Sequence, residues 1–89
     1  MSRHVSRKSR WTQVSAKEYR SSFGVVTYRA GAWEGRLVFM RWNIDTDSWR
    51  PETLAAGRFK RPRNAMICVE DKAIETQRRY GDDVKVALL

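Results

Sequence analysis

The side chains of this sequence that could act on a partner are mostly cations, and they gather in two short segments. The 89 residues carry 18 Lys and Arg against 10 Asp and Glu, a formal net charge of +8. Residues 1–20 hold six basic side chains and one acidic, and residues 58–63 hold four basic and none acidic. Local cation density favours a polyanion, because each neutralised phosphate releases condensed counterions. The charge pattern therefore predicts nucleic-acid binding; simple solvation of a tail and a loop is the alternative.

The predicted contacts come from residues 1–10, from a predicted hairpin and from the second basic segment. We expect Arg36 and Tyr28 on the outer face of the hairpin, where an arginine can donate two hydrogen bonds to guanine. Glu34 could instead hold Arg36 as a simple charge partner. The full set of predicted nucleic-acid contacts is Arg7, Lys8, Arg10, Tyr28, Arg29, Arg36, Arg41, Arg58, Lys60, Arg61 and Arg63.

The remaining cations of this set suit contacts to phosphate rather than to bases. Arg29 stands at the hairpin turn, and Arg41 follows in the next strand. Residues 58–63 run from a strand end to a helix start, where free backbone N–H groups also favour phosphate; alternatively, these side chains lie over the core. The arm of residues 1–10 could follow the DNA backbone or enter the minor groove, or only add non-specific affinity.

A three-stranded antiparallel sheet is predicted to position these side chains. Its strands cover residues 23–29, 33–42 and a stretch between Trp49 and Lys60, which are rich in β-branched and aromatic residues. Ala30 and Gly31 supply the hairpin turn. Pro51 is expected at a strand start or a sheet edge, and Leu54 and Phe59 are expected to point inward.

One C-terminal helix is predicted to pack on this sheet, from Pro62 to a terminator at Gly81. Its apolar stripe consists of Met66, Val69, Ala73, Gln77 and Tyr80, widened by Ile74. Residues 15–18 fit a capping box and could start one helical turn, whereas residues 84–89 fit either a short strand or a loose tail. The predicted class is α+β, with residues 1–10 as a disordered basic arm and residues 11–89 as one domain.

The predicted helix covers one sheet face and leaves the other available for function. Val38, Met40 and Trp42 place apolar side chains on that open face, which DNA contact does not explain. Such patches usually mark a partner surface, and a dimer mate, another protein or the chain around Trp11 could cover this one. A protein-interaction module is therefore the second hypothesis. RNA binding is the third, because Tyr28 and exposed tryptophans could stack unpaired bases.

A set of residues within about 22–80 resembles the pattern of the AP2/ERF DNA-binding domain. These residues are Gly24-Val25, Gly31, Trp33 and Leu37, then Gly57-Arg58-Phe59 and Ala65. The resemblance implies a three-stranded sheet that lies in the DNA major groove, an architecture also found in arm-site binding domains of phage-type integrases. The positions through which that family reads bases hold other residue types here, so the resemblance implies a role such as transcription regulation without a target sequence.

Nothing in the sequence indicates an enzyme or a cofactor. His4 is the only histidine and Cys68 the only cysteine, which excludes an internal disulfide and a cysteine-rich zinc site. No nucleophile, base and orienting group can be assembled, and no metal is predicted. The basic N-terminus has no apolar segment behind it, and no apolar run approaches the length of a membrane span. The expected location is therefore cytoplasmic, on the nucleoid in a bacterium or in the nucleus of a eukaryote, without a membrane partner.

Overall fold

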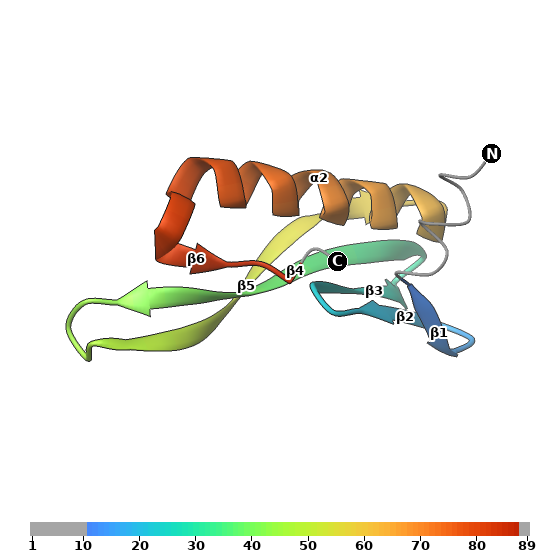
Figure 1. Cartoon of the computed structure of the whole chain (residues 1–89). Helices are drawn as coiled ribbons and strands as arrows, with labels where there is room; N and C mark the ends of the chain where they lie inside the picture. Colours follow the sequence, from blue (N-terminus) through green and yellow to red (C-terminus); the bar gives the residue numbers. More distant parts are fainter. Residues whose placement is uncertain (1–10, 88–89) are drawn as a thin grey trace.

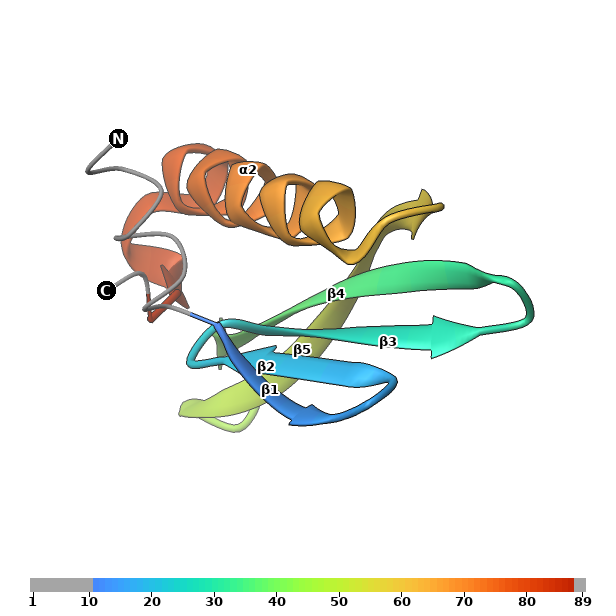
Figure 2. The same cartoon turned by 90° about the vertical axis from the view of Figure 1, so that its right-hand side faces the viewer.

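The computed structural model describes residues 11–87, which form one antiparallel sheet with a helix lying across one of its faces (Figure 1). The elements are β1 (Thr12–Ser15), β2 (Glu18–Ser21), β3 (Gly24–Arg29), β4 (Ala32–Asn43), β5 (Ser48–Phe59), α2 (Pro62–Tyr80), the 3-10 turn η1 (Gly81–Asp83) and β6 (Val84–Lys85). The strands lie in the order β1-β2-β3-β4-β5, and β6 pairs with β4. Viewed from its end, the sheet carries α2 on one side only (Figure 2). The predicted arm of residues 1–10 lies outside the described residues.

The predicted hairpin and helix are present with nearly the predicted bounds. Ala30 and Gly31 connect β3 to β4 with φ of 52° and 82°, the positive values that a tight two-residue turn requires. Helix α2 begins at Pro62, and Gly81 follows its last residue, as the proline and glycine signals predict. The order of β3, β4, β5 and α2 is the one predicted from the sequence pattern, and the class is α+β.

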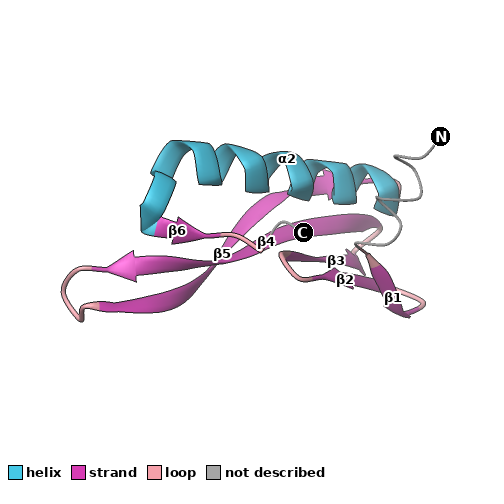
Figure 3. Ribbon diagram, in the orientation of Figure 1, coloured by secondary structure: helices cyan, strands magenta, loops and turns pink. Residues whose placement is uncertain are grey.

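The sheet has more strands than the three predicted. The capping-box segment at residues 15–18 starts no helix: it is the turn of the β1–β2 hairpin (Figure 3). The Ser15 hydroxyl accepts a hydrogen bond from the backbone N–H of Lys17 at 3.2 Å, which stabilises this turn instead of a helix end. At the other end of the chain, β6 pairs with Met40 and Arg41 of β4, beyond the point where β3 stops.

The core lies between α2 and the sheet, and its helical side is made of small residues. The buried apolar residues are Trp11, Phe23, Val26, Leu37, Phe39, Ala65, Val69, Ala73 and Val84. The helix is rotated from the predicted stripe, because Thr76 is buried whereas Ile74 is 47% and Tyr80 38% exposed. Leu54 points to the helix side, as predicted, because it pairs with the buried Leu37, but it is 40% exposed; Phe59 packs against the core.

Two glycines explain why α2 lies so close to the sheet. A Cβ atom at Gly24 would lie 2.6 Å from Val69 Cγ1, and one at Gly35 would lie 2.7 Å from Val69 Cγ2. Both distances are far below van der Waals contact, so neither position can carry a side chain while the helix keeps its place. Large side chains such as Ile74 are therefore excluded from this interface.

Trp11 joins the start of the described chain to the helix. Its indole N–H donates a hydrogen bond of 2.9 Å to the carboxylate of Glu70, and both side chains are buried. Its ring also packs edge-on against Phe23, with centroids 5.6 Å apart. Trp11 therefore lies on the helix side of the sheet, and the prediction that its segment could cover Val38 and its neighbours is wrong.

Candidate nucleic-acid interface

The sheet face opposite α2 is not covered by any element of the described chain (Figure 1). Strand alternation and register bring side chains of four strands onto this open face. It includes Glu18, Arg20, Val25, Thr27, Arg29, Glu34, Arg36, Val38, Met40, Trp42, Trp49, Thr53 and Arg58. The predicted contacts Arg29, Arg36 and Arg58 therefore share one surface.

Three arginines from neighbouring strands surround a shallow hollow on the open face. Arg20 pairs with Val25, and Val25 pairs with Arg36, so these three residues form one row across β2, β3 and β4. Arg29 lines the same hollow from the end of β3. Arg20 was not among the predicted contacts, because its strand β2 was not predicted.

Two glutamates lie among these arginines and form ion pairs with them. Glu18 pairs with Arg20. Glu34 lies 3.7 Å from Arg36 Nη2 and 3.3 Å from Nε of Arg58, its cross-strand neighbour. The charge-partner alternative for Glu34 is thus the contact found in the structure, and the carboxylate holds two guanidinium groups over β4.

Arg58 has a structural role in addition to this ion pair. Its Nη2 atom donates hydrogen bonds to the carbonyl oxygens of Arg29, at 2.9 Å, and Ala30, at 3.3 Å. The side chain therefore ties the edge strand β5 to the β3–β4 turn. Its guanidinium is less free to meet a phosphate than that of Arg29, whose side chain makes no hydrogen bond or ion pair within residues 11–87.

Tyr28 and Arg41 do not lie on the open face, which contradicts the outward placement predicted for Tyr28. Tyr28 pairs with Trp33, and their ring centroids are 5.2 Å apart on the side of α2. The cause is the two-residue turn, which sets these residues directly opposite each other. Arg41 lies over the ring of Tyr80 at 5.1 Å and 3.7 Å from the carboxylate of Glu52.

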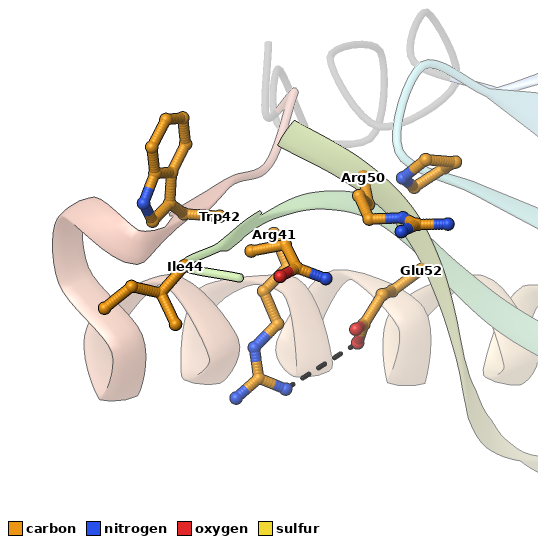
Figure 4. A pocket seen from close by; sticks show the side chains of 7 residues that line it. Arg41, Trp42, Ile44, Arg50 and Glu52 are labelled. Atoms are coloured by element: carbon orange, nitrogen blue, oxygen red, sulfur yellow. Dashed lines mark ion pairs between the residues drawn. The ribbon is translucent and has the colours of Figure 1, made fainter. Parts of the chain in front are cut away.

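A second hollow lies near the end of the β4–β5 hairpin (Figure 4). It is lined by Arg41, Trp42, Asn43, Ile44, Arg50, Pro51 and Glu52. Figure 4 shows Trp42 and Arg41 pointing to opposite sides of β4, so this hollow follows the hairpin edge instead of extending the open face. Arg41 and Arg50 stand directly opposite each other, and Glu52 offsets this repulsion by pairing with Arg41.

The segment from Arg58 to Arg63 rounds the sheet edge, from β5 to the first turn of α2. Lys60, Arg61 and Arg63 are exposed, and their side chains make no ion pair or hydrogen bond within residues 11–87. The first turn of α2 contains no acidic residue and no side-chain cap. Free cations therefore stand at the positive end of the helix dipole.

The predicted apolar residues do lie on the open face, where they form one patch with a further tryptophan. We call Val38, Met40, Trp42 and Trp49 the apolar patch; Val38 is 38% exposed. The rings of Trp42 and Trp49 are 5.4 Å apart, and Lys85 Nζ lies 4.4 Å from the Trp49 centroid. Trp49 could have been found from the sequence, because the hairpin loop places it opposite Trp42.

The remaining predicted features can be placed only in part. The predicted contacts Arg7, Lys8 and Arg10 lie outside the described residues. Among residues 11–87, no group of three or more His, Cys, Asp or Glu side chains could hold a metal ion. No helix in that range is long and apolar enough to cross a membrane.

Comparison with known proteins found no match to this chain. No family model, no curated protein and no solved structure matches it. The resemblance to the AP2/ERF domain stays a prediction from the residues that carry it.

Proposed function

We propose that this protein is a non-enzymatic nucleic-acid-binding protein that binds duplex DNA through its open face and the basic segment Arg58–Arg63. The observation that supports this most is the gathering of Arg20, Arg29 and Arg36 around one hollow of an uncovered sheet. Arginines from three strands on one surface attract neighbouring phosphates, and each contact gains free energy by releasing counterions.

The dimensions of the arginine row fit a duplex groove. Three antiparallel strands span two inter-strand spacings, about 10 Å in all, and the major groove of B-DNA is about 12 Å wide. In this pose we assign Arg36 to base edges and Arg29 to the backbone, as the sequence predicts. Glu34 limits the freedom of Arg36, which favours a fixed, directional contact over a diffuse one.

The basic segment supplies a second set of contacts at the sheet edge. Lys60, Arg61 and Arg63 are exposed and lie at a helix N-terminus, where backbone N–H groups also attract phosphate. A duplex in the open face would meet this segment with its flanking backbone. Phosphate contacts of this kind set position and salt dependence and carry no sequence information.

The experiment compares two double variants with the same change in charge. Arg29→Gln/Arg36→Gln removes two cations from the open face, and Arg78→Gln/Arg79→Gln removes two exposed cations from the far end of α2. Fluorescence anisotropy with a duplex of about 20 base pairs, at about 50 and 200 mM salt, measures both. We expect the open-face variant to bind about tenfold more weakly with a smaller salt slope, and the control to change less than about twofold. Equal losses, or binding insensitive to salt, would refute the proposal.

The apolar patch supports a second candidate function, a docking surface for a protein. The patch lies on the open face beside the arginine row, and its tryptophans remain partly exposed. Met adapts well to such contacts. Under this alternative Met40→Asp abolishes dimer formation in sedimentation and leaves duplex binding intact, whereas Ile74→Asp on the exposed side of α2 changes neither. If the protein is monomeric at all concentrations tested and Met40→Asp changes nothing, the apolar patch is not a homodimer interface.

A further inference from the structure

Three aromatic side chains lie side by side on the helix side of the sheet, one on each of β2, β3 and β4. We call Tyr19, Tyr28 and Trp33 the aromatic platform. The ring of Trp33 lies 5.7 Å from that of Tyr19 and 5.2 Å from that of Tyr28, measured between centroids, and it is inclined to them by 58° and 60°, so the three rings present faces in different directions. These residues share a face because Tyr28 pairs directly with Trp33, and Tyr19 pairs with the buried Val26.

Helix α2 covers this platform only in part: Tyr19 and Trp33 are partly buried against the core, whereas the helix starts too far along the sheet to cover Tyr28. The carbonyl oxygen of Ala65, in the first turn, lies 3.1 Å from the position of a Cβ at Gly35, so the helix meets β4 at Gly35. Trp33 stands two residues nearer the β3–β4 turn, and this turn projects past the start of α2 (Figure 2). Tyr28 is accordingly 36% exposed, although its neighbour Val26 is fully buried.

Cations border the platform, and the acidic residues of the neighbouring strands point away from it. Lys17 Nζ lies over the ring of Tyr28, 5.8 Å from its centroid, on a side chain that is itself exposed. Phe59 pairs with Trp33, and the free cations Lys60 and Arg61 follow Phe59 directly in the chain. Glu18 and Glu34 lie on the open face, and the first turn of α2 has no acid.

We propose that the aromatic platform stacks unpaired bases of single-stranded nucleic acid, while Lys17, Lys60 and Arg61 contact its phosphates. Aromatic rings flanked by cations suit a strand whose bases are free, because every base offers a π-face and every nucleotide a negative charge. An acidic peptide would meet the same cations, but its carboxylates would leave the three rings unused. Bases inside a duplex are stacked on each other and cannot reach these rings.

The inference rests on the proposed function and narrows the class of ligand. The open face and the platform lie on opposite sides of β3 and β4, and the basic segment rounds the edge beside them. A duplex on one side and a single strand on the other can therefore share the cations of this segment. The ligand class is nucleic acid with an unpaired segment next to a duplex.

The test uses the full chain and a labelled oligothymidylate of about 12 nucleotides, a length within the range that small single-strand sites occupy. We expect Tyr28→Leu, which keeps apolar bulk and removes the ring, to bind this oligonucleotide about tenfold more weakly and duplex DNA unchanged within about twofold. Tyr28→Phe, which keeps the ring, should bind the oligonucleotide as tightly as the unmodified protein does. Tyr80→Leu, at an equally exposed tyrosine on α2, should change neither ligand.

The outcomes separate this inference from the proposed function. Unchanged oligonucleotide binding by Tyr28→Leu, or an equal loss for both ligands, would overturn the inference. If circular dichroism shows that Tyr28→Leu is unfolded, the test is made on the unmodified protein, by measuring whether the oligonucleotide quenches its tryptophan fluorescence. The absence of quenching would overturn the inference. Displacement of the oligonucleotide by polyglutamate, with equal efficiency in Tyr28→Leu, would assign the site to an acidic peptide. Loss of duplex binding in the Arg29/Arg36 variant is a separate result that bears on the open face alone.

Discussion

The hydrogen bond between Trp11 and Glu70 connects residues 59 positions apart in the sequence, and both side chains are buried. A buried carboxylate that loses a donor keeps its desolvation cost, so this contact matters more than exposed ion pairs such as that of Arg20 with Glu18.

Trp11→Phe tests this contact, because phenylalanine keeps an aromatic ring against Phe23 and removes only the N–H donor with part of the ring. We expect a loss of about 1–3 kcal/mol in the free energy of unfolding, measured by urea denaturation. The matched control is the same change in a Glu70→Gln background, where the cost should be smaller because the charged acceptor is gone. Identical costs in the two backgrounds would show that ring volume, and not the hydrogen bond, carries the effect.

The face on which a single side chain lies could be predicted where alternation along one strand is unbroken. The prediction failed where two strands had to be aligned with each other. Val38, Met40 and Trp42 alternate with buried Leu37 and Phe39, so their shared face followed from the sequence. Tyr28 was assigned to the wrong face, although a turn of only two residues fixes Tyr28 opposite Trp33. The two-residue turn was visible in the sequence, and the register that it sets would have placed Tyr28 on the same face as Trp33.

Among the elements, the close packing of α2 on β3 and β4 depends on Gly24 and Gly35. The helix can approach the sheet this closely only because Gly24 and Gly35, which face it, have no Cβ atom. The edge strand β5 is continuous, but it contains Pro51 and a register shift opposite Gly35 and Arg36, features that discourage pairing with another sheet.

Gly35→Ala should destabilise the domain by about 1–3 kcal/mol, because the added methyl group would lie 2.7 Å from Val69 and 3.1 Å from the backbone of Ala65. Thermal unfolding followed by circular dichroism measures the loss. Adding Val69→Ala to Gly35→Ala should cost less than Val69→Ala costs alone, since it removes the clashing methyl groups. Strict additivity of the two changes would mean that α2 does not rest on Gly35 as described.

The elements that could be predicted are those with strong local signals. Helix α2 has a proline at its start and a glycine after its end, and the β3–β4 hairpin has apolar strands around a tight turn. Strand β1 has no such signal, because all of Thr12–Ser15 is exposed and its pairing with β2 depends on backbone hydrogen bonds. The capping-box prediction at Ser15 was wrong because a serine hydroxyl can also accept a hydrogen bond from the backbone N–H two residues further on, as it does from Lys17, and this stabilises a turn.

At the scale of the whole molecule, the net charge of +8 is the dominant feature. The open face and the basic segment lie within the described residues 11–87. The predicted contacts Arg7, Lys8 and Arg10 come before these residues in the chain. If all of these meet one polyanion, the salt dependence of binding should reflect the sum of their contacts.

Replacing residues 2–10 by a neutral Gly/Ser segment of equal length should weaken duplex binding. Its salt slope should fall by about 0.9 for each phosphate that the replaced cations neutralise. The free energy of unfolding should stay the same, because Trp11 is retained. Titrations at several salt concentrations measure the slope, and urea denaturation serves as the control. An unchanged slope would assign these cations to solubility alone.

Trp11 and Val84 stand near opposite ends of the described chain, yet both belong to the same core. A ribosome delivers the chain from its N-terminus at about 5–20 residues per second. Every element up to α2 therefore emerges before the strand that completes the packing. The domain closes only after Val84 has left the exit tunnel, so a nascent chain stalled earlier exposes apolar surface and becomes a substrate for chaperones or proteases.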